Sequence, residues 1–160
     1  MSTFADPATG SSDAAQPYRF LDTISYVRVP GASTGGRCSV VEMRLRDGHA
    51  PPMHVHEDAD ETIHVLDGTV AVHTQKGSRS VAAGGSAVLP RGEPHSLLAE
   101  ERSTVLVSTS PAGFEEFVTA VGEPAEDAVV PTTPPAEEAI GRVNELAGDH
   151  GIEIVGPPPA

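Results

Sequence analysis

Short segments of alternating apolar and polar residues, separated by glycine or proline turns, fill the middle of the chain. Residues 41–45 alternate apolar and charged side chains, which is the period-2 pattern of a strand with one buried face. Asp67-Gly68 lies between two apolar segments, residues 62–66 and 69–74, and favours a hairpin turn. Many short strands with frequent turns are typical of an antiparallel sandwich or barrel, so we expect an all-β fold over residues 18–110.

The two ends of the chain lack this strand pattern. Residues 1–17 are rich in Ser, Ala, Asp, Thr, Pro and Gly, and we expect a disordered arm there. Residues 111–160 favour two helices, the first begun by Ser110-Pro111 and the second capped by Thr133 and continued to about Ala147. The expected apolar faces are Phe114, Phe117, Val118 and Val121 in the first helix, and Ile140, Val143, Leu146 and Ala147 in the second. Helices this short need tertiary packing, so this extension should pack on the barrel or on a dimer partner.

The charge balance excludes some classes of partner. The 160 residues carry 23 acidic and 10 basic side chains, a formal net charge of −13, so nucleic acids and anionic membrane surfaces should be repelled. No run of 18 apolar residues is present for a membrane span, and no secretory signal is visible. Cys38 is the single cysteine, which excludes an internal disulfide and a cysteine-rich zinc site. We therefore expect a cytoplasmic protein with a small-molecule substrate.

A cluster of metal-ligating residue types lies within the strand region. His54 and His56 are two residues apart in an expected strand, so both imidazoles project to the same side. Glu61 shares the parity of apolar residues in the following strand, which places its carboxylate on a core-facing side where a partner is required. His95 begins another expected strand and offers a third imidazole. A metal ion shared by these side chains is the partner that this pattern favours.

The spacing around these residues resembles the motifs of the cupin superfamily. The first motif is matched by Gly48, His54, His56, Glu61 and Gly68, and the second by Gly84, Pro90, Gly92 and His95. Ala99 departs from the second motif, which ends in Asn. The resemblance implies a double-stranded β-helix, also called a jelly-roll or cupin barrel, with one divalent metal ion held by His54, His56, Glu61 and His95. The C-terminal segment up to Pro158 looks like the end of small bacterial single-domain cupins of the quercetin 2,3-dioxygenase-like kind.

This resemblance implies a metal-dependent enzyme that acts on a small enolic, aromatic or polyketide-like molecule, most readily as a dioxygenase. Fe(II) is the favoured metal, and Ni, Mn, Co, Cu or Zn also suit imidazole and carboxylate ligands. Glu61 is the expected catalytic base. Two alternatives stay open: a non-redox cyclase, isomerase or dehydratase with the metal as Lewis acid, and a non-catalytic binding protein, because the fold alone does not fix the function.

Strand parity also suggests the surroundings of the site. The expected substrate pocket consists of Met43, Ile63, Val65 and Leu97. The other four histidines are expected away from the site, with His64 and His73 facing outward and His49 and His150 at the surface. Phe114 and Phe117 should pack the first helix onto the barrel. An unpaired edge strand and two apolar helix faces favour a homodimer.

Overall fold

The computed structural model describes residues 9–10 and 15–160. Most of the expected N-terminal arm, residues 1–8 and 11–14, lies outside the described residues. Residues 16 and 17 are attached to the body of the protein, because the Gln16 side-chain amide donates a hydrogen bond to the carbonyl of Ala125, and the Ala125 N–H donates to the carbonyl of Pro17.

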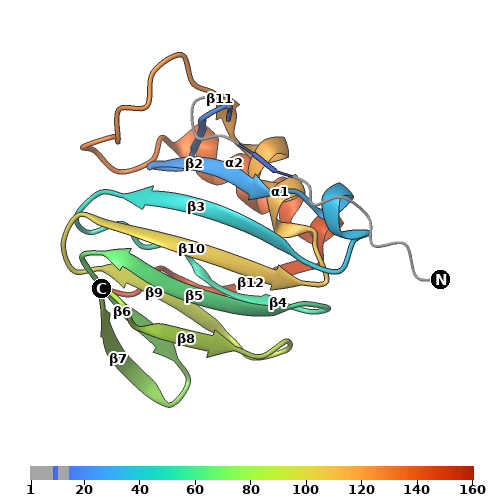
Figure 1. Ribbon diagram of the computed structural model, residues 1–160. Helices are drawn as coiled ribbons and strands as arrows, with labels where there is room; N and C mark the ends of the chain where they lie inside the picture. Colours follow the sequence, from blue (N-terminus) through green and yellow to red (C-terminus); the bar gives the residue numbers. More distant parts are fainter. Residues whose placement is uncertain (1–8, 11–14) are drawn as a thin grey trace.

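Two antiparallel sheets face each other, as a jelly-roll barrel requires, and this confirms the expected all-β fold class (Figure 1). The first sheet has the strand order β11 (Glu123–Pro124), β1 (Tyr18–Phe20), β2 (Thr23–Val29), β3 (Ser39–Leu45), β10 (Ser103–Ser110), β5 (Asp60–Asp67) and β8 (Ser86–Leu89). The second has the order β12 (Ile152–Gly156), β4 (Met53–His56), β9 (His95–Ala99), β6 (Thr69–Thr74) and β7 (Gly77–Ala82).

The core lies between the two sheets because alternate side chains of each strand point inward. Every second residue of β3 is buried, and β5 and β10 follow the same period. Gly68 lies in the turn between β5 and β6 with a φ of 81°, and a Cβ there would meet Ser103 and the carbonyl of Arg102. This turn therefore needs glycine both for its conformation and for its close approach to the start of β10.

Both helices begin later than the sequence predicts. Ser110 remains the last residue of β10, where it pairs with Asp60, and α1 (Phe114–Val121) follows the N-cap Gly113. The second helix, α2 (Glu137–Leu146), is not capped by Thr133 but by Ala136. The two prolines that follow Thr133 explain this correction, because a residue before proline is disfavoured in the α region and proline itself offers no N–H.

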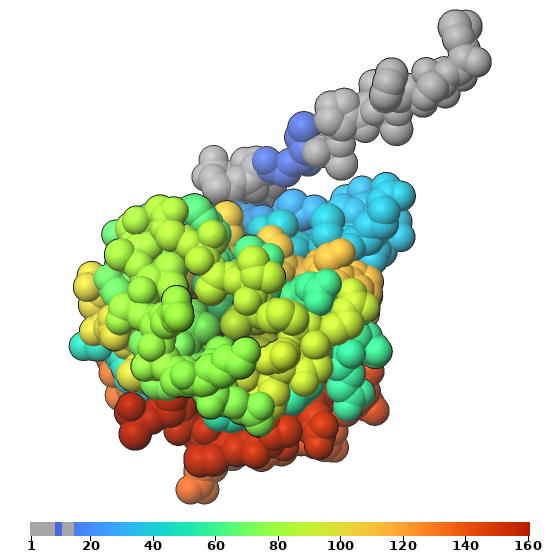
Figure 2. All heavy atoms as spheres, turned by 90° about the horizontal axis from the view of Figure 1, so that it is seen from below, coloured from blue at the N-terminus to red at the C-terminus, as the bar shows by residue number. Residues whose placement is uncertain are grey.

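The C-terminal segment continues past α2 through the 3-10 turn η2 (Ala147–His150) into β12. The expected C-cap Gly148 lies within η2, and Gly151 with a φ of 70° ends the turn instead. β12 pairs with β4, so the chain after η2 adds an edge strand to the second sheet. Figure 2 shows this orange-red segment along one side of the barrel, next to the green and yellow strands. A second 3-10 turn, η1 (Gly31–Thr34), connects β2 to β3.

The expected helix face is buried in α1 except for the half-buried Phe114, and only partly buried in α2. Phe117, Val118 and Val121 are almost inaccessible, and in α2 Val143 is buried whereas Ile140 is 39% exposed. No helix among the described residues is both long enough and apolar enough to cross a membrane.

Candidate metal centre

Two strands of the second sheet and one strand of the first bring four metal-ligating side chains together inside the barrel. His54 and His56 come from β4, Glu61 comes from the start of β5, and His95 comes from the start of β9, where it is paired with His54. His56, Glu61 and His95 are buried, and His54 is half-buried. The predicted strand parity thus holds for all four, since they share one interior space.

The carboxylate of Glu61 lies at the centre of this group. Its Oε2 is 2.8 Å from Nε2 of His56 and 3.0 Å from Nε2 of His95. One ligand atom from each of the four residues lies within 4.8 Å of the other three. One small ion could therefore contact all four side chains.

Backbone carbonyls fix the orientation of two of the rings. Nδ1 of His54 is 2.7 Å from the carbonyl oxygen of Pro52, and Nδ1 of His95 is 3.1 Å from that of Glu93. A carbonyl oxygen only accepts, so each Nδ1 carries the proton, and in the neutral ring Nε2 keeps a lone pair. Such second contacts hold the rings of metal-binding histidines in place.

Burial and neighbouring charges set the protonation of the cluster. Burial, together with the charge of His95, lowers the pKa of His54 to about 4, so this imidazole is neutral at pH 7. Burial alone would raise the pKa of Glu61, but the hydrogen bonds and charges of His56 and His95 hold it far below its ordinary value. Burial lowers the pKa of His95, and its contact with Glu61 more than offsets that effect.

The donor set fits a divalent metal ion. An ionised carboxylate and three imidazoles converge with no arginine or lysine among them, and a cation shared by the four would neutralise the buried charge of Glu61. Imidazole and carboxylate suit first-row transition metals. The four residues named from the sequence could thus hold a metal ion, and they come together as one cluster.

A small cavity adjoins this cluster. It has a volume of about 60 Å³ and is walled by apolar side chains, and His54 and Glu61 reach it from the cluster. Met43 and Leu97, both expected in the pocket, line it. Ile63 and Val65, also expected there, are buried in the core but are not part of its wall.

The C-terminal segment supplies the other side of this cavity. Phe114 and Phe117 of α1 line it, and the ring of Phe114 lies 5.9 Å from that of His56 in an edge-on arrangement. Val143 of α2 and Ile152 and Ile154 of β12 complete this side. The two phenylalanines therefore pack the helix, as expected, and also cover the cluster.

One histidine that the sequence places at the surface is buried instead. His49 is 2% exposed, and its Nδ1 contacts the buried carboxylate of Asp22, whose other oxygen accepts from Nε of Arg46. Burial raises the pKa of Asp22, but the contacts with His49 and Arg46 more than offset this and hold it below its usual range. The partners His49 and Asp22 are 27 residues apart in sequence, so no local pattern indicated the pair.

The remaining histidines lie away from the cluster. His64 and His73 are half-buried on β5 and β6, and Nε2 of His73 is covered without a hydrogen-bond partner. His150, expected at the surface, is half-buried, with its ring 5.4 Å from the ring of Phe117.

Comparison with known proteins agrees with this geometry. Residues 41–109 match the cupin domain family. The chain is 33% identical to quercetin 2,3-dioxygenase of Bacillus subtilis over 138 residues, which is 85% of this chain but 41% of that protein. The chain thus spans less than half the length of this curated relative.

Solved structures share the fold at low sequence identity. The structure of KdgF from Halomonas sp. superposes with a TM-score of 0.62 and 19% identity, covering 68% of this chain and 99% of that one. An RmlC-like cupin from Shewanella frigidimarina gives a TM-score of 0.59 and 16% identity, covering 69% and 95%. With its jelly-roll fold, its four-residue cluster and these similarities, this chain is a cupin that resembles quercetin 2,3-dioxygenase.

Proposed function

We propose that this protein is a metal-dependent enzyme that oxidises a small enolic or aromatic molecule with dioxygen. The observation that carries the proposal is the buried cluster of three imidazoles and one carboxylate, which borders an apolar cavity. The identity of 33% with a quercetin 2,3-dioxygenase supports the oxidative reaction.

His54, His56, Glu61 and His95 are the residues that would hold the metal. Fe(II) is our favoured ion, and Ni, Mn, Co, Cu or Zn fit the same ligands. When bound, such an ion lowers the pKa of a coordinated substrate hydroxyl and, if redox-active, promotes electron transfer toward dioxygen.

Glu61 is the residue that we propose as catalytic base. It is the only carboxylate among the described residues that line the inner cavity. A substrate hydroxyl in that cavity would lie beside the carboxylate of Glu61, whose Oε2 contacts His56 and His95. Proton transfer to a positioned carboxylate is a common form of general base catalysis.

The apolar residues around the cluster would bind and shield the substrate. Met43 and Leu97 come from the two opposing sheets, and Phe114 covers the cavity from α1. A flat ring between these side chains gains from burial of its apolar surface, and water is excluded from the acceptor oxygen of Glu61. In this proposal Ile63 and Val65 support the pocket from behind.

An oxygen electrode tests the proposed reaction. Protein loaded anaerobically with Fe(II) is mixed with 3-hydroxyflavone or with a smaller enol, and we expect oxygen uptake in step with substrate loss. Glu61→Gln should abolish the uptake, whereas His64→Gln on the outer side of β5 should leave it unchanged. Substrate loss that proceeds equally well without oxygen would contradict the oxygenase.

The size of the inner cavity favours a second candidate. About 60 Å³ is far below the roughly 300–1,000 Å³ of ordinary ligand pockets, so a molecule smaller than a flavonol fits more readily. A non-redox isomerase, cyclase or dehydratase that uses the metal as Lewis acid would suit such a molecule. Equal turnover by a Zn(II)-loaded protein under nitrogen identifies this candidate, and ligand binding without any turnover identifies a non-catalytic cupin.

We also propose that the protein is a homodimer. Exposed apolar side chains lie on edge strand β8, at Val88, and on helix α2, at Ile140, and an unpaired edge strand favours association. Sedimentation equilibrium at micromolar concentration should give twice the chain mass of 16.5 kDa. A mass of one chain at every concentration contradicts the dimer.

A further inference from the structure

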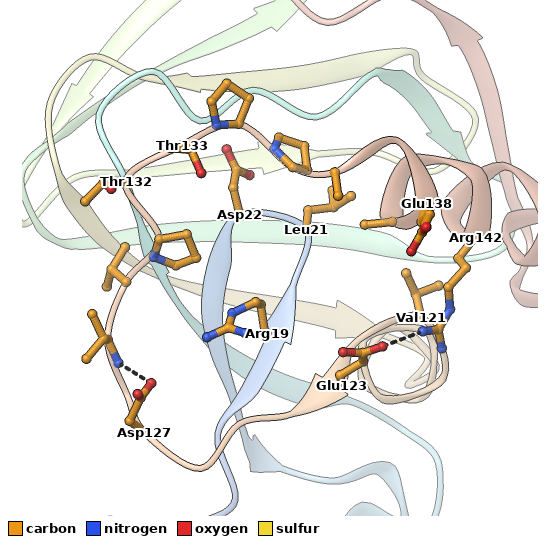
Figure 3. Close-up of a pocket in the computed structure, with 17 residues that line it drawn as sticks. Arg19, Leu21, Asp22, Val121, Glu123, Asp127, Thr132, Thr133, Glu138 and Arg142 are labelled. Carbon is orange, nitrogen blue, oxygen red and sulfur yellow. Dashed lines mark hydrogen bonds and ion pairs between the residues drawn. The ribbon is translucent and has the colours of Figure 1, made fainter.

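A second, larger pocket lies on the outside of the barrel and has no place in the chemistry above. It has a volume of about 620 Å³, which lies within the usual range for small-molecule sites. Its walls are the end of β1, the proline-rich segment of residues 130–136 and one face of α2 (Figure 3). This outer pocket is about ten times larger than the inner cavity beside the metal cluster.

Leu21 lies between the two spaces. Its side chain lines the inner cavity together with Glu61 and His54, and it also lines the outer pocket. The helix α2 separates the same two spaces, with Val143 on the inner cavity and Arg142 on the outer pocket. In Figure 3 Leu21 lies next to α2 at the end of β1. The side chain of Leu21 is therefore part of the wall that separates the outer pocket from the metal cluster.

The backbone at Leu21 is unusual. Its φ is 54°, the only positive value for a non-glycine among the residues that the structure describes. A leucine in this left-handed region is strained and persists only where the surroundings hold it. Backbone strain of this kind is concentrated at functional sites.

The surroundings of Leu21 do hold it. The next residue, Asp22, is fixed by His49 and Arg46, and the hydroxyl of Thr23 donates a 2.8 Å hydrogen bond to the carbonyl of Phe20. The contacts of buried Asp22 with His49 and with the half-buried Arg46 thus hold the turn that places Leu21 between the two spaces.

From this arrangement we propose that Leu21 is a specificity-determining residue, and that the substrate reaches the metal cluster from the outer pocket past its side chain. The inner cavity would take the few atoms that bind the metal, and the outer pocket would take the rest of an elongated molecule. This inference rests on the proposed function, because it assumes that the substrate binds at the metal cluster.

A thiol placed inside the cavity measures access without any metal or turnover. Met43, which lines only the inner cavity, is changed to Cys in a Cys38→Ser background, so that the protein carries one thiol. The rate of its modification is measured in metal-free protein with methyl methanethiosulfonate and with the bulkier benzyl methanethiosulfonate. This rate does not depend on enzymatic turnover. The access test therefore remains valid even if the oxygenase proposal fails.

Two substitutions at Leu21 give opposite expectations. Leu21→Gly removes the side chain and suits the positive φ, and it should raise the rate with the benzyl reagent about tenfold, with a smaller gain for the methyl reagent. Leu21→Trp should lower the benzyl rate by about the same factor. Circular dichroism checks that each variant is folded. If one of the two variants does not fold, the other is sufficient for the test.

Two control variants distinguish entry past Leu21 from a general increase in the accessibility of the cavity. Val129→Ala alters the outer pocket only, and Ile154→Ala alters the inner cavity only, at strand β12, so both should stay within about twofold of the parent. A faster benzyl reaction in Ile154→Ala than in Leu21→Gly would overturn the proposal, because access would then run past β12. Equal gains for both reagents in Leu21→Gly, or no change in either Leu21 variant, would also overturn it.

Discussion

Two buried clusters of histidine and carboxylate lie in this barrel, and they differ in what balances the carboxylate. Asp22 is held by His49 and by the guanidinium of Arg46, so its charge is balanced within the protein. Glu61 is bounded by three imidazoles, with no arginine or lysine in the group. We call the first cluster closed because its carboxylate already has a cationic side chain as partner, and the second open; Asp22 also lines the outer pocket, and Glu61 borders the inner cavity.

This difference separates a cluster with balanced charge from one that could hold a metal ion. A buried ion pair that already has its hydrogen bonds needs no further partner. A carboxylate surrounded by three imidazoles, of which His54 is neutral because of its low pKa, could provide ligands for a cation. The closed cluster holds the β1–β2 turn, and the open one could hold an ion.

The largest effect that we expect is on folding stability when the closed cluster is broken. Asp22→Ala leaves the buried His49 and the half-buried Arg46 without their partner, and breaking a buried pair in this way costs about 3–5 kcal/mol. Urea unfolding of the metal-free protein measures the loss. Metal affinity should stay within about twofold of the wild type, because Asp22 contacts none of the four ligands.

Asp60 provides the matched control for this prediction. The side chains of Asp60 and Arg91 are both exposed, and exposed ion pairs contribute little to the free energy of unfolding. Asp60→Ala should therefore lower stability far less than Asp22→Ala. Equal losses for the two variants would contradict the distinction between a buried and an exposed pair.

The next effect in size is stabilisation by metal. Binding to the folded state alone adds about 2.7 kcal/mol to the free energy of unfolding at a free metal concentration 100 times Kd. We expect this gain in the wild type and in Asp22→Ala, and no gain in His95→Ala. Urea titrations with and without metal measure it, and a gain that persists in His95→Ala would place the ion elsewhere.

The smallest effect is a pH dependence of the closed cluster. Folding lowers the pKa of Asp22, so its contribution to stability is complete above its unfolded pKa of about 3.9 and is lost as the pH falls through the folded value. The difference in unfolding free energy between wild type and Asp22→Asn should therefore be constant above about pH 5 and shrink below about pH 4. Metal-free protein in urea at pH 3 to 6 shows this, and a difference that grows in acid would refute it.

Strand parity and the spacing of the cupin motifs together predicted the open cluster. The alternation in β5 placed Glu61 on the buried side with Ile63, and the two-residue spacing of His54 and His56 placed both rings together. Strand parity tells which face of a strand a side chain occupies, but not how far along the barrel it lies. Ile63 and Val65 therefore point inward as predicted, yet neither borders the cavity.

Features that depend on contacts distant in sequence could not be predicted in this way. The burial of His49 depends on Asp22, and the strand β12 forms because β4 offers it an edge about 100 residues earlier. Leu21 shows no signal at all in its local sequence, since its conformation is set by the anchored turn around it.

Metal stoichiometry tests the central claim most directly. Protein dialysed anaerobically against excess Fe(II) or Ni(II), and then freed of unbound ion, should contain about one ion per chain in the wild type and in His49→Ala. His56→Ala, with a ligand removed, should contain almost none. Equal metal content in His49→Ala and His56→Ala, or no bound metal in the wild type, would contradict the assignment of the open cluster as the metal centre.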